Sequence, residues 1–560
     1  MRTGLLLFSS MFLAAACGDD GGAMEAGGTG GGTAESETND TETSPSSAGT
    51  DSQSGSATSD SATSGADTTG GAVPVDEPAR GISISRVEAN SGVAIPIAID
   101  GAWADGAQRN AQIPKNRNTA FRVYLDVEED IWVQREIEAR MTLFHADGTE
   151  SEYVERVLIA QDSSTSSFQS NIVIGVLAED MQPNAQFNVE LFEVGTGYEG
   201  LPEESEPPKA MPEPNYIGIE STYQNMRIMI VPIDYDFGGC QTQFDTSDEA
   251  LAPYIDHMFQ QNALENIDIE IHDLYRVDDL DLTGNGFFQL LNVMAQLRAA
   301  ESPDPNVYYY GLFDNCGACI GDGGGCTLGV ANGIPGDSMG EAGARVAIGA
   351  QYLSSNEVGI ETFVHEIGHN QGRRHIFCSG ANAAGTDPSY PYDDGKTTGW
   401  GFGVRDFQLR NGNTHFDYMS YCNPTWVSDW QWKETFARIQ TLSSWEGADM
   451  QDAMDGRYVL MGSVNTETGE ASWWTDRGWV EPEDAAPNYR VRFSFDDASS
   501  DDTLLVDSDP WSEGPWITVR APLPADFDAV TGIQLDTPSL TTSAPRNEIQ
   551  AFHLNSFQAP

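Results

Sequence analysis

The stretch Thr362-Phe-Val-His-Glu-Ile-Gly-His-Asn-Gln-Gly-Arg-Arg-His375 decides how the middle of this 560-residue chain folds. Apolar residues recur in and just before it at the spacing of one buried helix face, namely Ile360, Phe363, Val364 and Ile367. This spacing predicts a helix. On such a helix His365 and His369 lie one turn apart, so both imidazoles can bind one metal ion.

The residues around the two histidines complete a metal-binding pattern. Glu366 lies beside the ligand pair, where its carboxylate can accept a proton without binding the metal. Gly372 allows a sharp turn that ends the helix, and His375 can then return as a third ligand. Three neutral nitrogens leave a fourth position open for water, as in catalytic zinc sites. With only 8 histidines in the chain, a chance match to all five fixed positions is not credible.

The pattern HExxHxxGxxH resembles that of the metzincin metalloproteases, whose second mark is a methionine turn. Here that turn looks like Asp417-Tyr-Met-Ser-Tyr421, so the resemblance implies that Met419 lies beneath the metal. The segment from His365 to Gly372 is most similar to the adamalysin or reprolysin subgroup. That subgroup has Asp where this chain has Ile376, and Met419-Ser-Tyr421 is closer to the astacin and serralysin turn. The resemblance covers roughly residues 220–445 and leaves the subgroup open.

This resemblance implies a zinc endopeptidase that hydrolyses peptide bonds through metal-activated water. Its Zn²⁺ ligands would be His365, His369 and His375, with Glu366 as the general base. Tyr421 has two readings of equal standing, either a zinc and oxyanion partner or a packed tyrosine. Residues after the methionine turn line the substrate pocket in metzincins, which makes Trp426 a substrate-binding candidate.

The charge of the chain excludes some partners. Its 28 Lys and Arg against 86 Asp and Glu give a net charge of −58. Such a charge argues against binding to nucleic acid or to an anionic membrane surface. A protein or glycoprotein substrate is compatible with it, and the sequence does not define an oligomeric state.

The N-terminal residues are typical of export. Residues 1–16 combine a basic start, a short apolar core and three alanines, which predicts a signal peptide. Cys17 follows directly and resembles the lipidated cysteine of bacterial lipoproteins, although the leucine of that signal is one place early. Residues 17–79 are rich in Gly, Ser and Thr and predict a disordered tether. We expect an outward-facing outer-membrane lipoprotein, otherwise a secreted protein, with membrane contact only through the N-terminal lipid.

Changes of pattern along the rest of the chain predict a multidomain protein, with an α/β metzincin-like catalytic domain flanked by all-β, immunoglobulin-like sandwich modules. The boundaries expected are 80–200 for the first β-sandwich, 201–216 for a Pro-rich linker, 217–447 for the zinc domain and 448–560 for a C-terminal β domain. Within the zinc domain, Arg345–Gln351 reads as a short strand that could lie at a sheet edge.

Six cysteines remain after Cys17, an even number that predicts three disulfides in an exported protein. Cys378 lies three residues after the last ligand and Cys422 three after Met419, so we expect these two to pair. Pairing among Cys240, Cys316, Cys319 and Cys326 stays open. The Cys316-Gly-Ala-Cys319 spacing also permits a metal or redox role.

Two other functions fit the sequence. One is a glycan- or surface-binding adhesin with a structural metal, supported by the aromatic segment that contains Trp473, Trp474 and Trp479. The other is a glycoprotein-directed protease, in which a β module binds sugar and the zinc site cuts nearby.

Overall fold

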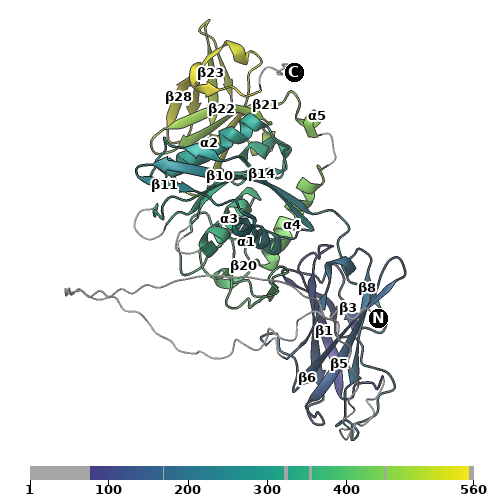
Figure 1. Ribbon diagram of the computed structural model, residues 1–560. Helices are drawn as coiled ribbons and strands as arrows, with labels where there is room; N and C mark the ends of the chain where they lie inside the picture. The colour runs from purple at the N-terminus through teal and green to yellow at the C-terminus, as the bar shows by residue number, and fades with distance from the viewer. Residues whose placement is uncertain are drawn as a thin grey trace, which may run out of the picture. The chain divides into compact units, whose positions relative to one another are not determined.

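The computed structural model describes residues 76–167, 170–320, 326–351, 356–381, 383–446 and 450–553 (Figure 1). The expected signal peptide, Cys17 and nearly all of the expected tether lie outside these residues. Most of the described secondary structure is β-sheet, helices are few, and β domains flank a central sheet. No helix in the described ranges is long and apolar enough to cross a membrane.

Two antiparallel sheets form the N-terminal β domain, with strand orders β3-β2-β1-β4-β7 and β6-β5-β8-β9. The alternating pattern of residues 82–194 predicts seven strands, and a strand is present at each of these places. Alternate residues of the inner strands are fully buried, because successive side chains of a strand point to opposite faces. The strands are β1 Ile82–Asn90, β2 Ala94–Ile99, β3 Ala102–Trp103, β4 Thr119–Val127, β5 Arg135–Phe144, β6 Glu150–Ile159, β7 Ile172–Val176, β8 Gln186–Glu193 and β9 Asn215–Tyr216.

The Pro-rich stretch 201–216 packs on this domain. Ala210 and Met211 are 1% and 2% exposed, and β9 adds to β8 as an edge strand. Prolines are tolerated along such an edge, where they break no inner ladder. The stretch expected to be a linker is therefore bound to the sandwich along much of its length.

The central sheet has the order β11-β10-β14-β16-β15, with β12 and β13 also paired to β10. Strands β10, β12, β14 and β16 run parallel, and β15 runs antiparallel to β16. The strands are β10 Asn225–Phe237, β11 Cys240–Gln243, β12 Asn266–Ile271, β13 Tyr275–Val277, β14 Val307–Phe313, β15 Gly329–Ala331 and β16 Val346–Ala350. The sequence left open whether the β16 segment lies at an edge, and in the structure the three-residue strand β15 lies outside it.

Helices cover both faces of the central sheet (Figure 1). Tyr308, Tyr310 and Leu312 of β14 face the core shared with α1 and α3, whereas Tyr309 and Phe313 face α2. Both faces are therefore buried, as expected of a largely parallel sheet. The helices are α1 Asp248–Gln261, α2 Gly286–Glu301, α3 Asn356–Asn370, α4 Asp429–Ser443 and the short α5 Met450–Met454.

Four short strands lie between α3 and α4. They pair as β17 with β18 and as β19 with β20. Their bounds are β17 Gly401–Phe402, β18 Leu409–Arg410, β19 Phe416–Asp417 and β20 Thr425–Trp426.

The C-terminal β domain has two sheets, β25-β26-β21-β22-β29 and β24-β23-β27-β28. Met461 and Trp474 pack toward α2, and Leu460 and Trp473 pack between the two sheets. The sequence pattern predicts a strand at 503–506, which is wrong, since most of that segment separates β24 from β25, and it indicates no strand where β27 and β28 lie. The strands are β21 Tyr458–Asn465, β22 Ala471–Arg477, β23 Arg490–Phe495, β24 Ser500–Thr503, β25 Asp507–Pro510, β26 Trp516–Pro522, β27 Val530–Asp536, β28 Thr541–Pro545 and β29 Ile549–Gln550.

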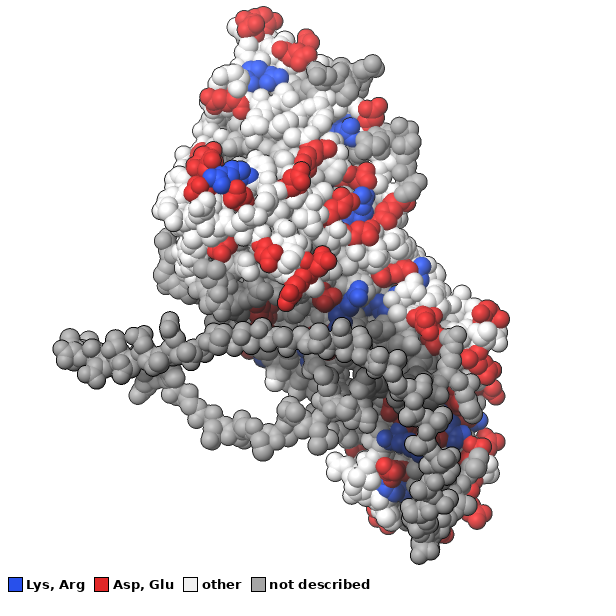
Figure 2. All heavy atoms as spheres, in the orientation of Figure 1, with Lys and Arg blue, Asp and Glu red and all other residues white. Residues whose placement is uncertain are grey.

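The described residues contain three disulfides, Cys240–Cys316, Cys319–Cys326 and Cys378–Cys422. Cys316 and Cys319 each pair elsewhere, so the metal or redox reading of their spacing was wrong. Figure 2 shows acidic side chains spread over the visible face, with fewer basic side chains among them.

Candidate metal centre

Helix α3 ends in a turn that returns the chain toward the two histidines. The Gly372 N–H donates to the His369 carbonyl at 2.8 Å, and the Arg373 N–H donates to the Gly368 carbonyl at 3.0 Å. Gly372 has φ +83°, so this is a Schellman ending that glycine adopts without strain. The chain then returns so that His375 faces His369.

The three histidine side chains converge on one point. His369 Nε2 lies 3.1 Å from Nε2 of His365 and 3.1 Å from Nε2 of His375. The candidate ligand atoms of all three lie within 4.8 Å of one another.

The hydrogen bonds of the other ring nitrogens fix which atoms carry protons. Nδ1 of His365, His369 and His375 lies 2.8, 2.7 and 2.8 Å from the carbonyls of Tyr418, Arg373 and Ala384. A carbonyl only accepts, so each Nδ1 donates and each neutral ring directs an Nε2 lone pair inward. Three lone pairs without a proton between them fit a cation, and imidazole nitrogens suit zinc and neighbouring transition metals.

Burial keeps these rings neutral. It lowers the pKa of His365 to about 3, with His375 contributing. It also lowers the pKa of His369 well below its usual value, helped by the two neighbouring imidazoles, and lowers that of His375. Neutral imidazole is the form that binds metal.

Glu366 lies between the ligand helix and the sheet edge. It is 4% exposed, and a Cβ on Gly329 of β15 would lie only 2.5 Å from its Cγ. Ser512 Oγ donates to Glu366 Oε2 at 3.1 Å. Burial, with the Glu513 carboxylate nearby, raises the pKa of Glu366 well above its usual range.

The turn around Met419 packs directly against the ligand helix. A Cβ on Gly368 would lie 2.4 Å from Met419 Sδ, and Met419 is fully buried. The Asp417 carboxylate accepts from the Met419 N–H at 3.0 Å and from the Ser428 hydroxyl at 2.6 Å. These bonds hold the carbonyl of Tyr418 that orients His365.

A disulfide and a backbone bond tie the ligand loop to this turn. Cys378 and Cys422 are joined, with their Cα atoms 6.3 Å apart. The Ile376 N–H donates to the Met419 carbonyl at 2.9 Å. The segment after His375 is therefore fixed at two points.

Of the two aromatic residues expected to act near the metal, Tyr421 lies at the histidine cluster and Trp426 lies in the core. The Tyr421 hydroxyl lies 2.9 Å from His375 Nε2 and is within reach of the site. Trp426 is 1% exposed, and its indole N–H donates to the Gly92 carbonyl of the N-terminal β domain at 2.9 Å. The substrate-binding role expected for Trp426 does not fit this position, because its indole is part of the core.

Two of the three tryptophans that supported sugar binding are in cores, whereas Trp479 is partly exposed. Trp473 is 3% exposed and Trp474 is fully buried. Neither side chain offers a surface to a glycan.

Two residues near the metal centre were missed by sequence reasoning, Ser512 and Glu513. Glu513 Oε1 lies 3.6 Å from His375 Nε2, and its carboxylate accepts from the Tyr421 hydroxyl. They lie 146 and 138 positions from their partners Glu366 and His375, and no local pattern marks them.

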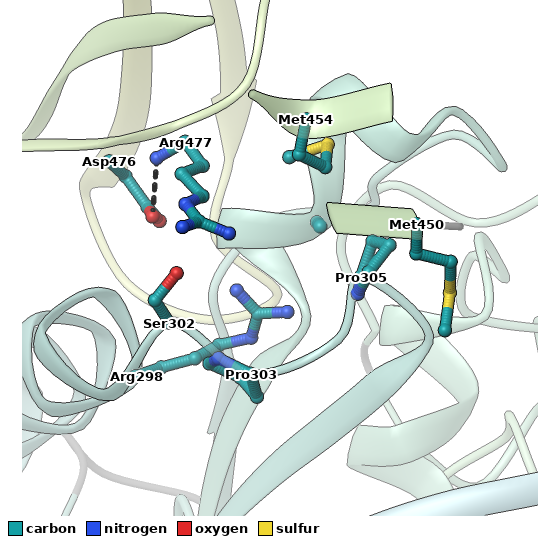
Figure 3. A pocket seen from close by; sticks show the side chains of 9 residues that line it. Arg298, Ser302, Pro303, Pro305, Met450, Met454, Asp476 and Arg477 are labelled. Atoms are coloured by element: carbon teal, nitrogen blue, oxygen red, sulfur yellow. Dashed lines mark hydrogen bonds between the residues drawn. The ribbon is translucent and has the colours of Figure 1, made fainter. Parts of the chain in front are cut away.

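A separate small pocket lies among α2, α5 and β22 (Figure 3). Arg298, Ser302 and Asp476 line it, and each has a buried polar atom without a hydrogen-bond partner among the described residues. Such a lining suits ordered water. It shares no residue with the histidine cluster.

Comparisons with known proteins give little. No family model and no curated protein matches the chain. Among solved structures, it is similar to metalloproteinase-II from Bacteroides fragilis at 13% identity and a TM-score of 0.21, over 62% of this chain and 87% of that one. It is also similar to a Bacteroides fragilis protein described as a beta-galactosidase, at 8% identity and a TM-score of 0.13, over 84% and 74%. Because both TM-scores are low, neither likeness supports a fold or an activity.

Proposed function

We propose that this chain is a zinc endopeptidase of the metzincin type. The observation that carries the proposal is the convergence of three Nε2 lone pairs beside a buried glutamate and above a packed methionine turn. A purely structural metal would need no adjacent carboxylate able to take a proton, and Glu366 is such a carboxylate.

Each residue has a distinct part in the proposed reaction. His365, His369 and His375 would hold Zn²⁺, which when bound would supply Lewis-acid chemistry to the scissile carbonyl and to water. Glu366 takes the proton from the attacking water and passes it to the leaving amine. The Tyr421 hydroxyl can donate a hydrogen bond to the oxygen that gains negative charge.

The setting of the enzyme is part of the same proposal. Its three disulfides fit an exported protein, and we propose anchoring through a lipid on Cys17. Equal fatty-acid labelling of the wild type and Cys17→Ala would contradict the anchor. The substrate would be a protein or a glycoprotein outside the cell.

Separating metal binding from hydrolysis tests the activity. Glu366→Ala removes no ligand, so it should keep about one zinc per chain. Its cleavage of casein or a mixed peptide library should fall by roughly 100- to 10,000-fold. His369→Ala should lose both zinc and activity, because two histidines cannot compete with a chelator.

Glu357→Ala is the matched control, because Glu357 is exposed on the same helix. It should keep both zinc and activity. Undiminished cleavage by Glu366→Ala would contradict the mechanism. A zinc-loaded chain that cuts nothing, even when Glu513 is replaced, would contradict the peptidase and favour the adhesin.

A further inference from the structure

The C-terminal β domain places a hairpin tip at the metal centre. This tip, Trp511–Trp516, joins β25 to β26 and is closed by a hydrogen bond from the Trp511 N–H to the Trp516 carbonyl at 3.0 Å. The indoles of Trp511 and Trp516 stack with ring centroids 5.2 Å apart. The indole N–H of Trp511 donates to the Thr518 hydroxyl at 2.9 Å. The tip is therefore held in one conformation.

Ser512 occupies the edge of the central sheet. Its N–H donates to the Ala331 carbonyl at 3.2 Å, and its hydroxyl oxygen accepts from the Ala331 N–H at 2.8 Å. Ala331 belongs to β15, the edge strand nearest the ligand helix. An extended peptide can bind a sheet only by pairing with such an edge, so Ser512 takes a position that a substrate backbone would need. The same hydroxyl donates to Glu366, the proposed base.

Glu513 then directs its carboxylate at the histidines. Oε1 lies 3.6 Å from His375 Nε2, and the carboxylate accepts from the Tyr421 hydroxyl. Within the described ranges, Glu513 has no ion pair with a lysine or arginine. A half-buried anion without a basic partner is costly unless a cation lies beside it.

Gly514, the next residue, packs the tip against α2. Gly514 has φ +78°, and a Cβ there would lie 2.8 Å from Phe288 Cε1 of α2. Only glycine combines this turn with so close an approach. The tip thus contacts β15, Tyr421 and α2 together.

We propose that the tip keeps the enzyme latent, with Glu513 as the fourth protein ligand of the metal and Ser512 on the substrate edge. This rests on the proposed function, because a catalytic site needs the fourth position for water. Carboxylate oxygen is an ordinary zinc ligand, so three histidines and Glu513 make a closed set. Activity then requires displacement or cleavage of the tip.

Two assays of the full chain test this without relying on hydrolysis. The first follows zinc transfer to a chromophoric chelator. The second follows binding of acetohydroxamate, a small metal-chelating anion, through the visible spectrum of the cobalt-loaded protein. Glu513→Gln should release zinc about 10- to 100-fold faster and should bind acetohydroxamate, which the wild type should exclude. Its kcat/KM for peptides should rise about tenfold or more.

Glu548→Gln is the control, because Glu548 is an exposed glutamate on the same domain, and it should match the wild type in every assay. Glu513→Asp, one methylene shorter, should behave like Glu513→Gln. If both variants release zinc and bind acetohydroxamate as the wild type does, Glu513 is not the fourth ligand, even if the variants cut peptides. If zinc release and acetohydroxamate binding both change but no variant cuts any peptide, the assignment of Glu513 as a ligand is supported and the proposed peptidase activity is contradicted.

Discussion

The contact between Gly368 and the methionine turn shows why the motif needs particular residues beyond its histidines. Gly368 lies between His365 and His369 on α3. All residues from 363 to 370, at the C-terminal end of this helix, are buried. Met419 Sδ and Tyr418 Cε2 would lie 2.4 and 2.9 Å from a Cβ at this position. The carbonyl of that same Tyr418 orients His365, so a shift of the turn would reach the metal ligands.

We therefore expect Gly368→Ala to be destabilising, although alanine favours helices by about 1 kcal/mol over glycine. Overpacking should cost roughly 1–3 kcal/mol, and zinc affinity should fall with it. Thermal unfolding and chelator competition would measure the two effects. Gly359→Ala on the same helix should lose less, because its nearest atom is the Tyr254 hydroxyl at 3.0 Å. A Gly368→Ala chain equal to wild type in both would show that the turn moves freely.

Among the elements, long and regular segments were predictable and short, distant pairings were not. The ligand helix follows from the helical spacing of its apolar residues, and the strands β10, β14 and β16 follow from short runs of apolar residues. Strand β15 has only the three residues Gly329–Ala331, too few to alternate visibly. Ser512 and Glu513 reach the metal centre through tertiary folding alone, and Glu513 is one of 86 acidic residues.

The strand β25 that leads to the hairpin tip carries a pH-sensitive group. Arg520 is the shared partner of Asp507 and Glu341, and Asp509 and Asp484 lie nearby. Burial, with Asp507 contributing, raises the pKa of Asp509 to about 7 from 3.8. The folded chain thus keeps a proton that the unfolded chain releases.

From this shift we expect stability to fall as pH rises from about 4 to about 7 and then to level off. Asp509→Asn should remove much of this slope and raise the free energy of unfolding at pH 8 by about 2 kcal/mol, while changing little near pH 4. Urea titrations at several pH values would measure it. Asp501→Asn, at an exposed position on β24, should leave the slope intact. An unchanged slope in Asp509→Asn would assign the pH dependence to other groups.

At the scale of the whole molecule, the N-terminal β domain and the region around the histidine cluster share one core. Trp432 of α4 is fully buried and donates its indole N–H to the Gln112 carbonyl at 3.0 Å. A Cβ on Gly92 would lie 2.2 Å from the same indole. Composition suggested separate modules joined by a linker, because it reports what each segment is made of and not what it packs against.

Arg117 also joins these two parts. It is 1% exposed, and its guanidinium donates to the carbonyls of Phe259, Asn262 and Leu264 at the C-terminal end of α1, at 2.9–3.0 Å. It also donates to the Ser91 carbonyl at 2.7 Å. Helix ends leave carbonyls without partners and carry partial negative charge, so a buried cation here satisfies several groups at once.

Removal of this guanidinium should destabilise the region around the histidine cluster from outside it. Arg117→Met leaves several buried carbonyls unpaired, each costing about 1–3 kcal/mol, so we expect a total loss of roughly 3 kcal/mol or more. Arg117→Lys should lose almost as much, because one ammonium cannot reach carbonyls spread over a planar fork. Arg156→Met, at a side chain 56% exposed, should cost less than about 1 kcal/mol. Calorimetry of the zinc-free chain would measure the unfolding temperature of all three variants. Because α1 packs on α3 through Tyr254 and Phe363, we expect the zinc affinity of the Arg117 variants to fall together with their stability. Arg117→Met and Arg156→Met with equal unfolding temperatures would mean that the two parts fold independently.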